Sequence, residues 1–139
     1  MVHLSFFKAY RTEESSTSKF GITIIMVIIG LTGSIAMGKS TTAQMFMKMH
    51  IPVYDADKTV HGLFQKGGEA VDKIAFSFPS SVVDGAIDRN RLGALVFKDT
   101  EKLKLLEEIV HPLVDLKRHQ FLLAQRRQKT KMVVLDVPL

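Results

Sequence analysis

The stretch that decides the fold is residues 27–40, which read VIIGLTGSIAMGKS. Its first part, Val27–Leu31, is a short, continuous and mostly β-branched apolar run, a pattern typical of a parallel strand buried on both faces. Its second part, Gly33–Ser40, fits the phosphate-loop pattern GxxxxGK[ST] at every fixed position. The sequence therefore predicts a buried strand followed by an anion-binding loop.

The chemistry of such a loop depends on this spacing. Glycines let backbone N–H groups approach phosphates closely, and a helix beginning near Gly38 points its positive end at the anion. Lys39 then reaches the β- and γ-phosphates, and the Ser40 hydroxyl ligates Mg²⁺. The alternative is a turn with a surface lysine, but the preceding strand and a helix with Ala43 and Met47 on one face favour the phosphate loop. We therefore expect binding of a nucleoside triphosphate with Mg²⁺.

Two further strands are expected to end in carboxylates. Val53–Asp55 forms a brief second strand, which is followed by Asp57. In open α/β sheets the ligand crevice lies outside the carboxyl ends of the strands. A carboxylate there can take a proton from an attacking hydroxyl or hold the water shell of a metal, or it can cap the next helix. Both interpretations stay open for this pair. Met132–Asp136 forms the third strand, and Asp136 is a candidate Mg²⁺ group or a strand-end turn residue.

The order of elements predicts an α/β fold of the P-loop NTPase type, with a parallel sheet and flanking helices. Residues 56–130 are expected to be mostly helical and to form an insertion between strands two and three, with a new helix opening at His111-Pro112. About three strands make a thin sheet for this architecture. We therefore interpret 26–139 as the front part of a longer P-loop domain whose last strands are missing.

Residues 1–25 differ from the remainder, because they show neither a helical nor a strand period. We expect them to form a disordered extension.

The chain of 139 residues is 46% apolar and 24% charged, which excludes a disordered or collagen-like protein. It has no cysteine, which excludes disulfides, cysteine metal ligands and a cysteine nucleophile and is compatible with a cytoplasmic location. Its longest apolar run, Ile22–Leu31, is far shorter than the ~20 residues that span a bilayer, so no membrane partner is expected.

Five motifs together resemble the dephospho-CoA kinase family, in the same order along the chain. The resemblance runs from about Met26 to Leu139 and is more specific than the phosphate loop alone. The matching segments are Ile29–Thr41, Ile51–Asp57, Asp88–Gly93, Val110–Leu113 and Leu135–Leu139.

The resemblance implies ATP-dependent phosphorylation of the ribose 3′-hydroxyl of dephospho-CoA, the last step of coenzyme A synthesis. It implies ATP, Mg²⁺ and dephospho-CoA as ligands, a helical CoA-binding region and a mobile lid. Asp57 takes the position of the catalytic base, beside the catalytic Lys39. His111 is interpreted as a buried structural residue. The ATP-binding positions fall on Gly33, Ala36, Met37, Gly38, Lys39, Ser40 and Thr41. The family usually carries glycine or serine where Ala36 and Met37 stand, a change that backbone binding tolerates.

Other function classes remain as alternatives. The net charge of +5 favours anionic partners or reflects only a mildly basic surface. The run 117–131 is basic without one acid, but it carries no nucleic-acid motif, so a solvated helix face is favoured over nucleic-acid binding. A P-loop switch or an inactive kinase fragment remains open, because the lid arginines of the family lie beyond these residues, although the base-reading motif NKxD of GTPases is absent here.

Overall fold

The computed structural model describes residues 9–10, 25–32 and 38–137. The chain forms two compact units: the strand unit, Met1–Ala56 with His119–Leu139, and the helical unit, Asp57–Arg118. Within the described ranges, no helix is long and apolar enough to cross a membrane.

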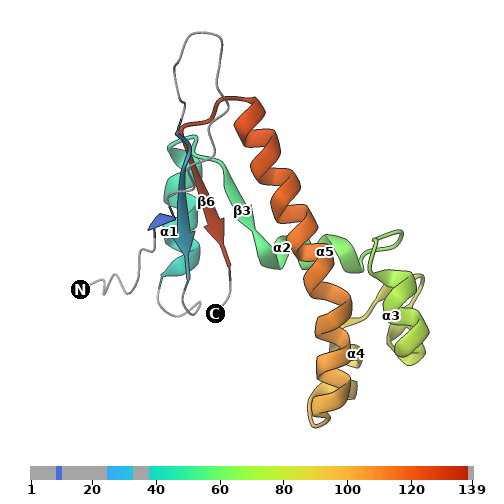
Figure 1. The fold of residues 1–139 in the computed structure, drawn as a ribbon. Coiled ribbons are helices and arrows are strands. Elements are labelled where there is room, and N and C mark those ends of the chain that lie inside the picture. The colour runs from blue at the N-terminus through green and yellow to red at the C-terminus, as the bar shows by residue number, and fades with distance from the viewer. Residues whose placement is uncertain (1–8, 11–24, 33–37, 138–139) are drawn as a thin grey trace. The chain divides into compact units, whose positions relative to one another are not determined.

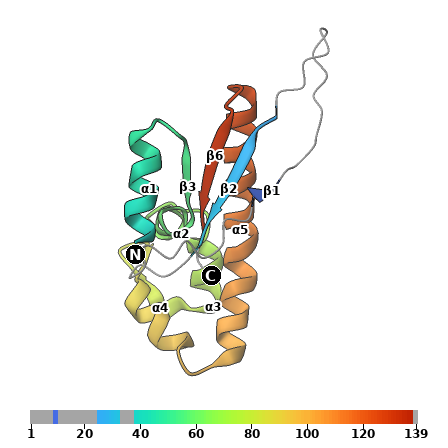
Figure 2. The same cartoon turned by 90° about the vertical axis from the view of Figure 1, so that its left-hand side faces the viewer.

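The strand unit contains a sheet with the order β1-β2-β6-β3. β6 (Met132–Asp136) lies between β2 (Val27–Leu31) and β3 (Val53–Asp55), and both neighbours run parallel to it, as Figures 1 and 2 show. The three predicted strands and the α/β class are thereby confirmed. The short β1 (Ala9–Tyr10) pairs antiparallel with β2 and belongs to the segment expected to be an extension, most of which lies outside the described residues. The boundary proposed at residue 26 stays a prediction.

Helices cover the two faces of this sheet differently. Ile28 and Val133 point to one face, where the last turns of α5 (Thr100–Arg127) contribute Phe121 and Leu122. Side chains alternate along a strand, so Asp136 points to the opposite face, which is the face of α1 (Lys39–Lys48).

The expectation of strands buried on both faces holds for only one of them. Val133 and Val134 in β6 have no exposed surface, because neighbouring strands flank them and helices pack on the sheet. In β2, by contrast, Ile28 is buried while Val27 is 40% exposed. The expectation was wrong for β2, whose first residue no described helix covers.

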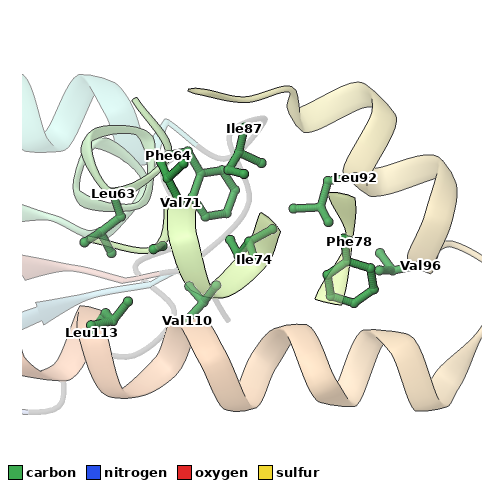
Figure 3. Packing of buried hydrophobic residues seen from close by; sticks show 11 residues of the cluster. Leu63, Phe64, Val71, Ile74, Phe78, Ile87, Leu92, Val96, Val110 and Leu113 are labelled. Atoms are coloured by element: carbon green, nitrogen blue, oxygen red, sulfur yellow. The ribbon is translucent and has the colours of Figure 1, made fainter. Parts of the chain in front are cut away.

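The helical unit is built around a single apolar cluster. α2 (Ala56–Phe64), α3 (Val71–Ser77) and α4 (Arg89–Val96) contribute to it with the first part of α5. Figure 3 shows Ile74 of α3, which is fully buried, among side chains from the other elements. The buried members are Leu63, Phe64, Ala70, Val71, Ile74, Phe78, Ile87, Leu92, Val96, Val110 and Leu113.

A small hairpin interrupts the helices and was not part of the sequence prediction. A single 3-10 turn, η2 (Pro79–Ser81), leads into β4 (Val82–Val83), which pairs antiparallel with β5 (Ala86–Ile87). The two connecting residues, Asp84 and Gly85, have φ angles of 51° and 79°. Asp-Gly between two short apolar runs is a strong hairpin signal, because both turn residues must adopt positive φ.

The prediction that a new helix opens at His111-Pro112 was wrong. α5 runs without interruption through Pro112, which lacks the N–H group that would bond to the carbonyl of Glu108. Val110 and Leu113 on either side are both buried in the apolar cluster, and this packing continues the helix across the proline. His111 itself is exposed, which corrects its interpretation as a buried histidine.

Candidate nucleotide-binding site

A buried ion pair marks the carboxyl edge of the sheet in the strand unit. The Nζ atom of Lys39 lies 2.7 Å from Oδ1 of Asp136, and the two side chains are only 10% and 11% exposed. The same Oδ1 is buried, and among the described residues the Lys39 ammonium is the partner that compensates its charge. The pair joins the first residue of α1 to the last residue of β6.

A second carboxylate lies next to this pair. Asp55 and Asp136 are partners in the register of β3 and β6, so they point to the same side of the sheet. Adjacent strands are about 5 Å apart, and two carboxylates so placed repel each other unless a cation lies close by. Asp55 is exposed, whereas Asp136 is largely buried against Lys39. Among the described residues, Asp55, Asp136 and Lys39 thus lie at this edge of the sheet.

The start of α1 is suited to an anion. Gly38 precedes the helix with a φ of 80°, a conformation that favours glycine. Among the described residues, no side chain caps the helix and its first turn has no acidic residue, so its positive dipole end favours an anionic ligand. Ser40 and Thr41 are exposed in this first turn.

The predicted site residues fall into three groups. Lys39 contacts Asp136 at the edge of the strand unit, and Gly38, Ser40 and Thr41 are the neighbours of Lys39 at the start of α1. Three further predicted phosphate-loop residues lie outside the described residues: Gly33, Ala36 and Met37. The third group is the predicted base alone.

Asp57, the predicted base, is the second residue of α2 and belongs to the helical unit. Its side chain is exposed and lies in the first helical turn, where a carboxylate interacts favourably with the helix dipole. It follows Asp55 by two positions, so the chain passes from the sheet edge directly into the helix that carries it.

The oxygen donors at the sheet edge fit a Mg²⁺ ion whose remaining coordination positions are filled by water and by phosphate oxygens. Among residues 9–10, 25–32 and 38–137, no group of three or more His, Cys, Asp or Glu side chains could hold a metal. The Ser40 hydroxyl and the buried carboxylate oxygen of Asp136 are hard oxygen donors of the kind that Mg²⁺ prefers. Mg²⁺ usually takes one or two protein ligands and fills its octahedron with water and phosphate oxygens.

Sequence reasoning did not find the Lys39–Asp136 contact or the register of Asp55 with Asp136. Each aspartate was placed at a strand end, but their adjacency depends on β6 lying between β2 and β3.

The Asp88–Gly93 motif also has a visible structural role. Asp88 Oδ1 accepts a hydrogen bond from Arg91 N at 2.9 Å and so caps α4, and Arg89 lies 5.7 Å from the ring centroid of Phe64.

A family model described as dephospho-CoA kinase matches residues 27–139. The chain belongs to the dephospho-CoA kinase family. Among curated relatives, the dephospho-CoA kinase of Paramagnetospirillum magneticum is 56% identical over 114 residues, which are 82% of this chain and 54% of that protein. The dephospho-CoA kinase of Nitrobacter winogradskyi is 48% identical over 114 residues, which are 82% of this chain and 56% of that protein.

Solved structures share the fold. TT1252 from Thermus thermophilus matches with a TM-score of 0.65 and 37% identity, over 80% of this chain and 55% of that one. The dephospho-CoA kinase from Campylobacter jejuni matches with a TM-score of 0.64 and 25% identity, over 78% of this chain and 55% of that one. The chain thus spans about half the length of the curated relatives and solved structures that it matches.

Proposed function

We propose that the complete protein transfers the γ-phosphoryl group of ATP to the ribose 3′-hydroxyl of dephospho-CoA, the last step of coenzyme A synthesis. Membership of the dephospho-CoA kinase family supports the reaction. The observation that carries the assignment of the site is the convergence of Lys39, Asp136 and the uncapped start of α1 at one sheet edge. We also place the reaction in the cytoplasm.

The strand unit would bind the nucleotide. The N–H groups of the first turn of α1 would receive phosphate oxygens, with Lys39 directed at the β- and γ-phosphates. Thr41 and the loop residues Gly33, Ala36 and Met37 would complete this cradle. Mg²⁺, held by Ser40 with Asp136 at its water shell, would neutralise charge on the phosphates.

The helical unit would present the acceptor. Asp57 is exposed at the start of α2, and a carboxylate there can accept the proton of the attacking 3′-hydroxyl. The proton would pass to Asp57 as the hydroxyl oxygen bonds to the γ-phosphorus, and ADP would leave. General-base assistance of this kind is typically worth about 10²–10⁴-fold in rate.

The test is an assay of the complete protein with Mg·ATP and dephospho-CoA, followed by ADP formation and product mass. We expect one ADP for each phosphorylated acceptor. Coenzyme A is the matched control acceptor, since its 3′-oxygen already carries a phosphate, and it should give no transfer. A P-loop switch would bind ATP but produce no phosphorylated acceptor, and that result would reject the kinase proposal.

A further inference from the structure

Asp136 is an anionic partner of Lys39 in the strand unit. The Lys39 ammonium lies 2.7 Å from Oδ1 of Asp136, and neither side chain is more than 11% exposed. A nucleotide phosphate at the start of α1 therefore meets a lysine whose charge is compensated and, next to it, the negative charge of Asp136. Both features oppose binding of a nucleotide that carries no Mg²⁺.

A divalent cation removes both obstacles at once. Among the described residues, the Lys39 ammonium is the partner of Asp136 Oδ1, so a cation or its water shell that takes the place of the ammonium compensates the same carboxylate oxygen. Once the cation compensates Asp136, the Lys39 ammonium is free to move to the phosphates. The cation also reduces the repulsion between the carboxylate and the phosphates.

We propose that the Lys39–Asp136 ion pair selects metal-loaded nucleotide: Asp136 withholds Lys39 from Mg²⁺-free ATP and releases it only when Mg²⁺ arrives with the phosphates. Asp136 is in this account a positioning residue for Lys39. The inference rests on the proposed ATP site and adds to it a discrimination between two forms of the same nucleotide.

The test compares ATP affinity with excess EDTA and with excess Mg²⁺, by calorimetry on the complete protein and its Asp136→Asn variant. The amide keeps the shape of the side chain but removes its charge. We expect Mg²⁺-free ATP to bind about ten- to a hundredfold more tightly to the variant, because Lys39 is released and a close negative charge is lost. Mg·ATP should bind more weakly, so the preference for the metal-loaded form should collapse.

Asp55→Asn is the matched control. It removes the same charge from the register partner of Asp136, on the same side of the sheet. If the effect comes from the specific pair with Lys39, Asp55→Asn should change Mg²⁺-free affinity by less than about threefold. Equal gains in the two variants would overturn the proposal, because general repulsion would then explain them.

The Lys39→Met background provides a second control. There, Asp136→Asn has no lysine to release, so its gain in Mg²⁺-free affinity should shrink severalfold. An undiminished gain contradicts the proposal, as does unchanged Mg²⁺-free affinity in the single variant. Failure of the wild-type protein to bind Mg·ATP would reject the proposed function itself, which is a different result.

Crystal structures of the wild-type protein keep the test independent of how any variant folds. With Mg²⁺-free nucleotide, the Lys39 Nζ–Asp136 Oδ1 contact should persist. With Mg²⁺ and nucleotide, Lys39 should lie on the phosphates and the contact should be broken. A contact that persists with Mg²⁺ and nucleotide bound would contradict the proposed movement of Lys39 from Asp136 to the phosphates.

Discussion

The two units of the chain are held together by different interactions. The helical unit encloses an apolar cluster in which Ile74 and Ala70 have no exposed surface. Among the described residues, the corresponding cluster of the strand unit has three buried members, and backbone pairing and the Lys39–Asp136 ion pair hold its sheet edge. Substitutions in the helical unit should therefore change stability first, whereas substitutions at the sheet edge should change ligand binding first.

The largest effect is expected for Lys39→Ala in the strand unit. No other described side chain of α1's first turn carries a positive charge, so the β- and γ-phosphates lose their cation. Calorimetry should show Mg·ATP affinity falling at least a hundredfold, beyond measurement at ordinary concentrations. Lys48→Ala, at the other end of the same helix, is the control and should bind normally. Unchanged affinity in Lys39→Ala would remove the phosphate-site assignment.

Ile74→Ala tests the helical unit. Removing a fully buried isoleucine side chain leaves a cavity, and the free energy of unfolding should fall by about 2–5 kcal/mol. Phe76→Ala in the same helix is the control, because Phe76 is 91% exposed. Urea unfolding measures both variants. Mg·ATP affinity of the folded Ile74→Ala protein should be unchanged. A large loss of affinity would contradict the claim that substitutions in the helical unit change stability and not nucleotide binding.

A smaller effect is expected at the start of α4. Asp88→Ala removes the hydrogen bond that caps the helix, and the free energy of unfolding should fall by about 1 kcal/mol. Asp88→Asn keeps an oxygen that can accept from Arg91 N and should retain most of the stability. If the asparagine variant is as unstable as the alanine variant, the carboxylate has a role other than capping.

The smallest effect concerns pH and the start of α5. The backbone N–H of Lys102 donates to Asp99 at 3.0 Å and, with the Lys102 side chain, lowers the pKa of Asp99 below its usual 3.8. A carboxylate with a lowered pKa stabilises the folded state above its unfolded pKa, and this contribution is lost as pH falls through the folded pKa. Wild type should therefore lose more stability than Asp99→Asn below about pH 4. Parallel pH profiles would contradict this assignment.

Sequence reasoning located the three parallel strands because each is a short apolar run bounded by glycine, proline or aspartate. It failed where distant parts of the chain decide the outcome. Pro112 continues a helix because the cluster packs on Val110 and Leu113, a fact that no local rule contains. The Asp84-Gly85 hairpin was visible in the sequence and was overlooked.

The site shows the same division between local and distant information. The positions of Lys39, Ser40 and Asp136 follow from a motif and from strand ends, so they could be named from the sequence. Their contacts could not, since the ion pair requires β6 to lie beside β2 with α1 on the face of Asp136.

The central claim is that the strand unit binds ATP while Asp57 of the helical unit accepts the proton. Its most direct test is the steady-state rate of the Asp57→Asn protein, with ATP affinity measured alongside. Asp57 belongs to the helical unit, so its loss should lower turnover of dephospho-CoA by about 10²–10⁴-fold while Mg·ATP affinity stays as in the wild type. Asp55→Asn, two positions earlier at the sheet edge, should cost less. Normal turnover in Asp57→Asn together with an inactive Asp55→Asn would contradict the account and assign proton transfer to the strand unit.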